Sequence, residues 1–260
     1  MSLNIISLNV NGIKEKAKRQ AIFQWLGKQN ANVCLLQETH CENDEDVNKW
    51  SREWGGESYW SFGTNFSRGV AILIQENLDI KASNIVKDKD GRFISIILKI
   101  DECSLQLINV YAPNNGNARV EFFRNLKQVV IDCCNLEGTD LIIGGDFNCA
   151  MNNSLDRRYN VNTLQDRRQD QGVAELKELM LEYDLQDIWR RRNPTIKRYS
   201  YLKKNSKSAS RIDFWLICKT IDPLVTRSTI THAIRSDHSA IELTLKNKHT
   251  RQGAGILENQ

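Results

Sequence analysis

The chain alternates short runs rich in β-branched residues with longer segments whose apolar residues recur at helical spacing, and this alternation restricts its fold more than any other feature. Helices are predicted where apolar side chains share one stripe, at residues 16–29, 119–134 and 171–183. The predicted strands lie at residues 5–10, 32–37, 70–74, 93–100, 105–110, 140–143, 212–218, 228–233 and 240–245. Because strands outnumber helices, we expect an α/β sandwich in which sheets form the interior and helices cover them.

No repeat, low-complexity tract or linker rich in Pro, Gly or Ser interrupts this pattern before residue 245. Since a length of 260 residues fits one large domain, we expect a single domain over residues 1–245. Residues 246–260 lose the periodicity and are expected to begin a linker. No apolar run approaches the roughly 18 residues that span a bilayer, and the N-terminus lacks the basic and apolar regions of a signal peptide. Neither secretion nor membrane insertion is expected.

The seven cysteines are odd in number, scattered and mostly surrounded by apolar residues. This distribution is typical of small buried side chains in a reducing compartment and not of a disulfide framework. Cysteine and histidine also lack the paired spacing of a zinc site. We therefore expect neither disulfides nor zinc.

Polar side chains stand where the predicted strands end or interrupt their apolar runs. One such side chain is usually a turn residue, a helix cap or a solvated group. In this chain they recur in six segments, Asn9-Val10-Asn11-Gly12, Gln37-Glu38-Thr39-His40, Tyr111-Ala112-Pro113-Asn114, Asp146-Phe147-Asn148, Arg211-Ile212-Asp213 and Ser236-Asp237-His238. A carboxylate or amide beside a buried strand is costly unless it is paired or binds a metal. If the strands share one sandwich, these groups meet at one edge, as the active sites of open sheets do.

Carboxylates and amides without cysteine are the ligands that hard divalent cations prefer, so Mg²⁺ or Mn²⁺ is the expected metal. With a histidine in the set, the residues supply what phosphodiester hydrolysis needs: an oriented water, charge stabilisation on the non-bridging oxygens and support for the leaving oxygen. Competing chemistries lack their motifs. The sequence has no phosphate-binding P-loop, no nucleophile elbow, no HExxH motif and no dinucleotide-binding glycine motif after the first strand.

The six segments resemble, in the same order, the motifs of the endonuclease/exonuclease/phosphatase superfamily. Within it, three segments are most similar to the apurinic-type endonuclease domain at the N-terminus of non-LTR retrotransposon (long interspersed element) polyproteins, namely Gln37-Glu38-Thr39-His40, Tyr111-Ala112-Pro113-Asn114 and Ser154-Leu155-Asp156-Arg157. The resemblance spans residues 5–245. It implies a four-layered α/β sandwich, with two packed mixed β-sheets flanked by helices, and a Mg²⁺-dependent nuclease.

The resemblance implies metal-binding and phosphate-binding roles for five residues. Glu38 matches the metal-binding glutamate, and Asp237 lies at the metal edge. Asn9 and Tyr111 match groups that contact the scissile phosphate. Asn11 stands where repair-type members carry Asp, which leaves one negative charge fewer near the metal and puts a direct Asn11 ligand in question.

The resemblance also implies the residues that act on the reacting atoms. Asp146 matches the residue that orients or deprotonates the attacking water, with Asn148 beside it. His238 matches the histidine that binds the phosphate or stabilises the transition state, oriented by Asp213. That orienting role is reasonable physically, because a carboxylate on one imidazole nitrogen fixes the tautomer and favours the charged ring.

Residues 190–211 carry nine Lys or Arg and no Asp or Glu, more than the net charge of +4 of the whole chain. Residues 199–202 and 211–218 are predicted to be two strands around a basic loop. A solvated loop is the ordinary interpretation of such a charge run, but DNA contact is favoured beside a nuclease site. The resemblance agrees, since retrotransposon endonucleases have a groove-probing hairpin at this place. The expected DNA contacts are Arg157, Ser200, Lys203, Lys204, Lys207 and Arg211.

We therefore expect an endonuclease that nicks one strand of duplex DNA and leaves a 3′-hydroxyl. By resemblance, this end primes reverse transcription by a polymerase further along the same polyprotein, so the site of action is the nucleus after synthesis in the cytoplasm, with no membrane partner. The alternatives are an abasic-site repair endonuclease, a phosphoinositide or sphingolipid phosphoesterase of the same superfamily, and a catalytically silent nucleic-acid-binding module. The basic segment counts against the lipid phosphoesterase, and the full set of catalytic residue types counts against the silent module.

Overall fold

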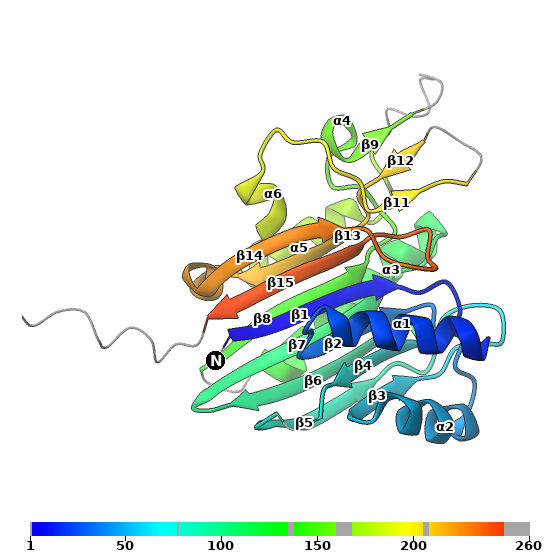
Figure 1. Cartoon of the computed structure of the whole chain (residues 1–260). Coiled ribbons are helices and arrows are strands. Elements are labelled where there is room, and N and C mark those ends of the chain that lie inside the picture. The colour runs from blue at the N-terminus through cyan, green and yellow to red at the C-terminus, as the bar shows by residue number, and fades with distance from the viewer. Residues whose placement is uncertain (1, 77, 135–137, 160–167, 205–207, 247–260) are drawn as a thin grey trace, which may run out of the picture.

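Two six-stranded sheets pack face to face (Figure 1). The computed structural model describes residues 2–76, 78–134, 138–159, 168–204 and 208–246. The first sheet has the strand order β14 (Val225–Thr231), β15 (Ala240–Lys246), β1 (Ser2–Asn9), β2 (Val33–Gln37), β4 (Val70–Ile74) and β3 (Glu57–Ser61). The second has the order β10 (Leu185–Asp187), β13 (Asp213–Cys218), β8 (Thr139–Asp146), β7 (Cys103–Tyr111), β6 (Phe93–Ile100) and β5 (Ile80–Lys87).

Both sheets are mixed, because β1 runs parallel to β2 and β7 runs parallel to β8, whereas the other pairs within the two sheets are antiparallel. Helices cover the outer faces. The first sheet packs against α1 (Lys16–Lys28) and α2 (Asp44–Trp54), and the second against α3 (Gly116–Cys134) and α5 (Val173–Glu182). The predicted four-layered α/β sandwich is confirmed.

The layers follow from the alternation of side chains along each strand. In β1, Ile5 enters the core between the two sheets, whereas Ile6 enters the core under α1. In β13, Trp215 points between the sheets and Phe214 packs on the helix side. Each strand therefore needs apolar residues on both faces, which explains the continuous apolar runs in the sequence.

A small third sheet lies at one end of the sandwich, with the order β11 (Tyr201–Leu202), β12 (Ala209–Ser210) and β9 (Arg157–Arg158) (Figure 1). Near it lie two short helices, α4 (Asn153–Asp156) and α6 (Ile188–Arg192), and a 3-10 helix, η2, covers Lys219–Leu224. The predicted basic hairpin is present as β11–β12, but its return strand is residues 209–210 and not 211–218. Residues 213–218 instead pair with β8 and β10 in the second sheet.

Helix α2 and strands β3, β5 and β10 were not expected from the sequence. Helix α2 is acidic and its apolar stripe is short: only Trp50 is buried, with Val47 and Trp54 partly buried beside it. Its ends do carry signals: the Asn43 side chain accepts a hydrogen bond from Asp46 N at 3.0 Å, and Gly55 closes the helix with φ 87°. Strands β3 and β5 are edge strands. Most of β5 is exposed, so its sequence does not alternate between apolar and polar residues as a half-buried strand does.

Within the described part of the chain, no helix is long and apolar enough to span a membrane. Apart from Lys246, the predicted linker lies outside the described residues. The domain boundary near residue 245 stays a prediction.

Candidate active site

The polar residues that end the central strands meet at one edge of the sandwich, on strand faces that point between the two sheets. In the second sheet β7, β8 and β13 are neighbours, and their register places Tyr111 opposite Asp146 and Asp146 opposite Asp213. In the first sheet Asn9 lies opposite Gln37 at the ends of β1 and β2. Pairing of strands therefore brings together residues that are far apart in the sequence.

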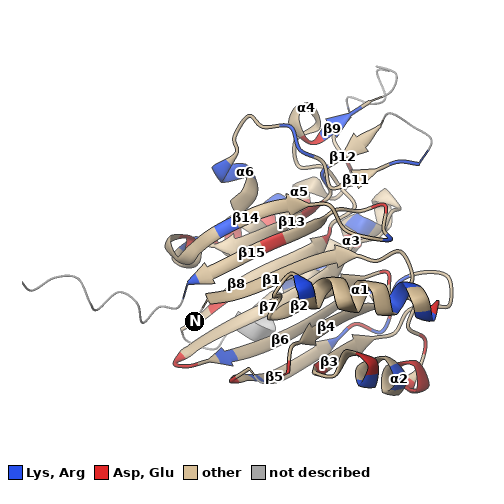
Figure 2. Ribbon diagram, viewed as in Figure 1, with Lys and Arg blue, Asp and Glu red and all other residues tan. Residues whose placement is uncertain are grey.

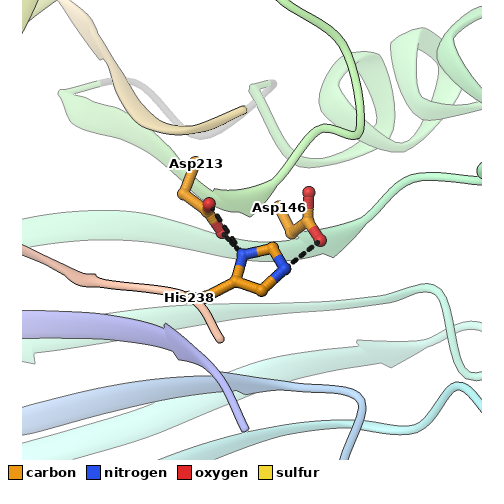
Figure 3. A group of neighbouring side chains, drawn as sticks. All are labelled: Asp146, Asp213 and His238. Atoms are coloured by element: carbon orange, nitrogen blue, oxygen red, sulfur yellow. Dashed lines mark hydrogen bonds and ion pairs between the residues drawn. The ribbon is translucent and has the colours of Figure 1, made fainter. Parts of the chain in front are cut away.

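His238 lies between two buried carboxylates (Figure 3). Its Nδ1 is 2.9 Å from Asp213 Oδ2, and its Nε2 faces Asp146 Oδ2 at 4.0 Å, which is too long for a hydrogen bond. The segment that carries the ring is fixed as well, because His238 N donates to Ser236 Oγ at 3.0 Å and Ser236 Oγ donates to Asn9 O at 2.6 Å. The ring is thus held from one side and has its second nitrogen free to act.

The two carboxylates keep this ring protonated. Burial alone would lower the pKa of His238, but the charge and hydrogen bond of Asp213, together with the charge of Asp146, outweigh it and raise the pKa to about 10. Burial and the charge of Asp213 raise the pKa of Asp146 to about 7. At neutral pH the ring is therefore cationic and can donate its Nε2 proton to a phosphoryl oxygen, while Asp146 is close to its point of ionisation.

A single amide joins Asp146 to Glu38. Asn9 Nδ2 donates to Glu38 Oε1 and to Asp146 Oδ2, each at 3.0 Å. Burial alone would raise the pKa of Glu38, but contacts with His40, Asn9 and Tyr111 outweigh it and lower the pKa to about 2. The pKa of Glu38 is lowered and that of Asp146 is raised, and such a difference between neighbouring carboxylates indicates two different roles. Glu38 stays ionised, as a cation ligand must, and Asp146 can take up a proton.

Three residues that follow the strand ends adopt left-handed backbone: Asn11 (φ 46°), Glu38 (φ 52°) and Asn148 (φ 50°). Residues other than glycine rarely adopt this region, and such residues cluster at functional sites. The turns direct their polar groups into the site, since Asn11 Nδ2 donates to Asp237 Oδ1 at 3.0 Å and Asn148 N donates to Asp146 Oδ1 at 2.9 Å.

The predicted catalytic residues are thus joined by contacts at one edge, although their individual roles stay predictions. This set is Asn9, Glu38, Tyr111, Asp146, Asn148, Asp213, Asp237 and His238.

The donor set suits a hard divalent cation, because oxygen ligands dominate it. Asp146, Asp213 and His238 offer ligand atoms that all lie within 4.8 Å of one another. A protonated imidazole has no lone pair for a metal, however, and Asp213 already holds that ring. Glu38 is the better ligand, since it is ionised and its side chain is 23% exposed. The metal roles of Asn11 and Asp237 stay predictions.

The profile of the endonuclease/exonuclease/phosphatase family matches residues 6–238, which include every catalytic residue described above. The chain belongs to this family. Family membership confirms the prediction of an enzyme that hydrolyses phosphoesters, because the family comprises nucleases and phosphatases.

This member of the endonuclease/exonuclease/phosphatase family is 30% identical over 247 residues to the transposon TX1 uncharacterized 149 kDa protein of Xenopus laevis, covering 94% of this chain and 18% of that protein. Among solved structures, it resembles AP endonuclease LMAP from Leishmania major with a TM-score of 0.79 and 17% identity, over 95% and 88% of the two chains. It also resembles the 3′ phosphatase NExo from Neisseria bound to product DNA hairpin, with a TM-score of 0.72 and 18% identity, over 94% and 99%. At these identities the two structures show the shared fold.

The predicted DNA contact of Ser200 is wrong, because this side chain is fully buried beneath the site. Ser200 Oγ donates to Asp213 Oδ2 at 2.6 Å and accepts hydrogen bonds from Ile212 N and Asp213 N, both at 3.1 Å. The hydroxyl therefore fixes the carboxylate that in turn holds His238.

Arg211 is likewise fully buried, so its predicted DNA contact is also wrong. Its guanidinium binds Asp156 Oδ1 through Nε at 2.7 Å and Asp187 Oδ2 through Nη2 at 2.7 Å, and it lies over the rings of Trp189 and Phe214. These carboxylates outweigh the effect of burial and raise the pKa of Arg211, so a buried charge is neutralised in place.

The other predicted DNA contacts lie at the surface or outside the described residues. Lys203 and Lys204 are exposed, and Arg157 is partly exposed and paired with Asp170. Lys207 lies outside the described residues. DNA contact by these four residues stays a prediction.

A polar network between the sheets supports the site from below and was not expected from the sequence. Gln37 Nε2 donates to Asn109 Oδ1 at 2.7 Å and to Ser7 Oγ at 3.0 Å, and Asn109 Nδ2 donates to Leu36 O at 2.9 Å. The signal was present, since all three polar residues stand at inward positions of otherwise apolar strands. His40 was also missed: its Nε2 lies 3.8 Å from Glu38 Oε2 and has no hydrogen bond within the described residues.

Replacing Ser200 by alanine is expected to lower the rate of phosphodiester cleavage about 10-fold, the lower range for losing a partner that orients a catalytic group. Asp213 loses the hydroxyl that fixes it, so the His238 ring loses its alignment. Single-turnover cleavage of a labelled duplex measures the rate, and Ser200→Thr restores it. Ser228→Ala is the matched control, because Ser228 Oγ is buried without a hydrogen bond in the described structure. A wild-type rate in Ser200→Ala would contradict the positioning role.

Proposed function

We propose that the chain is a divalent-metal-dependent endonuclease that nicks one strand of duplex DNA and leaves 3′-hydroxyl and 5′-phosphate ends. The observation that carries this proposal is the arrangement of His238 between Asp213 and Asp146, with Glu38 joined to Asp146 through Asn9. A proton acceptor, a cationic proton donor and a permanently ionised ligand then face one edge of the sandwich. These are the groups that hydrolysis of a phosphodiester requires.

Two residues of the chain act on the reacting atoms. Asp146 orients the attacking water and accepts its proton, and its raised pKa makes it a stronger base than an ordinary aspartate. His238 donates from Nε2 to a non-bridging oxygen of the phosphate, where negative charge increases in the transition state. Asp213 holds the ring in the tautomer that directs Nε2–H toward the substrate.

Glu38 is the residue that would hold the cation. When bound, the cation would supply charge stabilisation for the phosphate and for the leaving 3′ oxygen, which takes up a proton from solvent as its bond to phosphorus breaks. Asn9 and Tyr111 keep the Glu38 carboxylate in place beside Asp146. Both also remain the proposed contacts of the scissile phosphate.

The substrate is proposed to be DNA because Lys and Arg residues occur on the elements that border this edge (Figure 2). The hairpin β11–β12 is attached to the segment that carries the histidine: Leu202 N donates to Asp237 O at 3.3 Å, and Ser239 N donates to Ser200 O at 2.6 Å. Beyond Leu202 the hairpin continues with exposed Lys203 and Lys204. Their position beside the site suits contact with backbone phosphates of a bound duplex.

The variant Lys203→Ala/Lys204→Ala is expected to flatten the salt dependence of duplex binding. Every phosphate that the protein no longer neutralises reduces the slope of log K against log salt by roughly 0.9, so the slope falls by at most about 2. Fluorescence anisotropy with a labelled duplex at several salt concentrations measures it. The control is Lys81→Ala/Lys177→Ala, which removes two exposed lysines from β5 and α5. If the slope of log K against log salt is the same in the two variants, Lys203 and Lys204 do not contact DNA.

The decisive experiment is a plasmid-nicking assay in Mg²⁺ and in EDTA, followed by analysis of the ends. We expect conversion of supercoiled to relaxed plasmid in Mg²⁺ alone, with 3′ ends that a polymerase can extend. Cleavage of an abasic duplex and not of an intact one would favour a repair endonuclease, the activity in the name of the Leishmania protein. Inactivity on every DNA substrate would refute the proposal.

The similarity to a transposon protein supports a proposal for the biological role. The alignment to the Xenopus transposon protein covers 94% of this chain. We propose that the 3′-hydroxyl primes reverse transcription by a downstream part of the same polyprotein, in the nucleus. The test is extension of the nicked strand on an added RNA template by the full-length protein.

A further inference from the structure

One aromatic side chain is far more exposed than its size would lead one to expect. Phe66 is 84% exposed, in the loop of residues 62–69 that connects β3 to β4. A single exposed apolar side chain needs no explanation by itself, but loops carry binding residues more often than other elements do, and this loop is attached to a catalytic segment. Phe62, in the same loop, is also exposed.

The backbone around Phe66 forms a tight turn. Thr64 N donates to Ser67 O at 2.8 Å, and Ser67 N and Phe66 N both approach the Thr64 hydroxyl, at 3.1 and 3.4 Å. Gly63 is packed so closely that a Cβ there would lie 2.4 Å from the carbonyl carbon of Arg68. The backbone of the tip is therefore held in a tight turn in the free protein, which reduces the backbone entropy lost when Phe66 makes a contact.

The loop is attached to the segment that carries the proposed metal ligand. Thr39 N donates to Gly69 O at 3.0 Å, and His40 N donates to Arg68 O at 2.9 Å. These two donors directly follow Glu38 in the sequence. Phe66 is therefore held in a fixed relation to the catalytic edge, through the first sheet, whereas the basic hairpin is attached to the segment of Asp237 on the side of β15.

Two arginines lie near these elements, Arg68 in the loop itself and Arg92 against a catalytic residue. The Arg68 side chain is 39% exposed and loosely paired with Asp90 at 3.4 Å. The Arg92 guanidinium lies 4.8 Å from the centre of the Tyr111 ring, and Tyr111 contacts Glu38. An exposed aromatic beside arginines matches the chemistry by which proteins bind nucleic acid, with the ring on the bases and the cations on phosphates.

We propose that Phe66 contacts the bases of the substrate duplex beside the scissile phosphate, stacking on a base or entering a base step from the minor groove. This inference rests on the proposed function for its substrate, duplex DNA. The 62–69 loop and the β11–β12 hairpin then grip the duplex from opposite sides of the catalytic edge. Because a wedged base step must unstack, Phe66 favours sequences whose steps deform easily and so contributes to the choice of cleavage site.

The test compares Phe66→Ala with Leu181→Ala. Leu181 is the matched control, because it is 85% exposed on α5, a helix on the outer face of the second sheet. We expect Phe66→Ala to weaken binding of an intact duplex by about 5- to 100-fold, the range for losing one aromatic that stacks on a base, and Phe66→Trp to restore it. The duplex carries 2-aminopurine beside a mapped cleavage site, and its fluorescence is expected to rise with wild type and with Phe66→Trp but not with Phe66→Ala.

The proposal is overturned if Phe66→Ala binds the duplex and changes its fluorescence as wild type does, or if Leu181→Ala is weakened equally. The cleavage maps give a second check, because loss of the wedge flattens the preference among sites and an unchanged map contradicts it. Failure of the proposed function has a different signature, since wild type itself would then fail to nick in Mg²⁺. Binding and fluorescence need no cleavage, so the two failures are distinguishable.

Discussion

Replacement of Asp146 by asparagine is expected to lower the rate of nicking by about 10²- to 10⁴-fold, the effect of removing a positioned general base. The amide keeps the size of the side chain and can still accept a hydrogen bond from Asn148 N, but it cannot take up a proton from water. DNA binding should be retained, because Asp146 is buried and carries no contact to the basic hairpin in the described structure. Single-turnover nicking and anisotropy measure the two effects separately.

The control for this variant is Asp79→Asn, an exposed aspartate just before β5. The pH dependence of the nicking rate gives an independent check that Asp146 acts as the base. Since the pKa of Asp146 is raised to about 7 by burial and by Asp213, its basic form is lost as the pH falls through 7, and the wild-type rate falls with it. If Asp146→Asn nicks at the wild-type rate, Asp146 is not the general base.

Replacement of His238 by alanine is expected to slow nicking by about 10²- to 10³-fold, as loss of one preorganised donor to a developing oxyanion does. The ring is cationic because Asp213 and Asp146 overcome the effect of burial and raise its pKa to about 10. Its donor form is therefore present below pH 10 and is lost as the pH rises through that value. A titration of the ring by NMR measures this pKa, and Asp213→Asn should lower it.

His232 provides the matched control, because it is exposed just after the end of β14. His232→Ala should nick at the wild-type rate. If the two histidine variants behave alike, or if the His238 ring titrates near its ordinary pKa of about 6.5 in the wild-type protein, the ring is not held as the structure indicates. A His238 pKa near 6.5 would also mean that the ring is neutral at pH 7 and could bind a metal.

The sequence predicted the sandwich well because its strands are buried on both faces. Continuous β-branched runs such as residues 70–74 and 93–100 have few other structures available to them, and both form the strands expected. The site was predictable for the same reason, since a polar residue such as Asp146 at the end of a buried strand needs a compensating partner. Helix α2 was not predicted because most of its residues are polar or charged and only Trp50 is buried.

Two of the predicted DNA contacts were wrong, because residue type does not reveal burial. Arg211 stands in a run of basic residues and so looked like a phosphate contact, yet two aspartates far away in the sequence enclose it. Ser200 looked like a polar surface residue, yet it lies under Asp213. Only tertiary contacts distinguish such residues from Lys203, which has the same local surroundings and is exposed.

The burial of Arg211 separates the base of the β11–β12 hairpin from its tip. At the base, Asp156 and Asp187 bind Arg211 in the interior, the Ser200 hydroxyl holds Asp213, and the centre of the Tyr201 ring lies 4.8 Å from that of the His238 ring. Beyond the base, Lys203 and Lys204 are exposed. Exchange of Lys203 and Lys204 should therefore leave the support of Asp213 and His238 intact, so the surface beside the site can vary while the site itself stays the same.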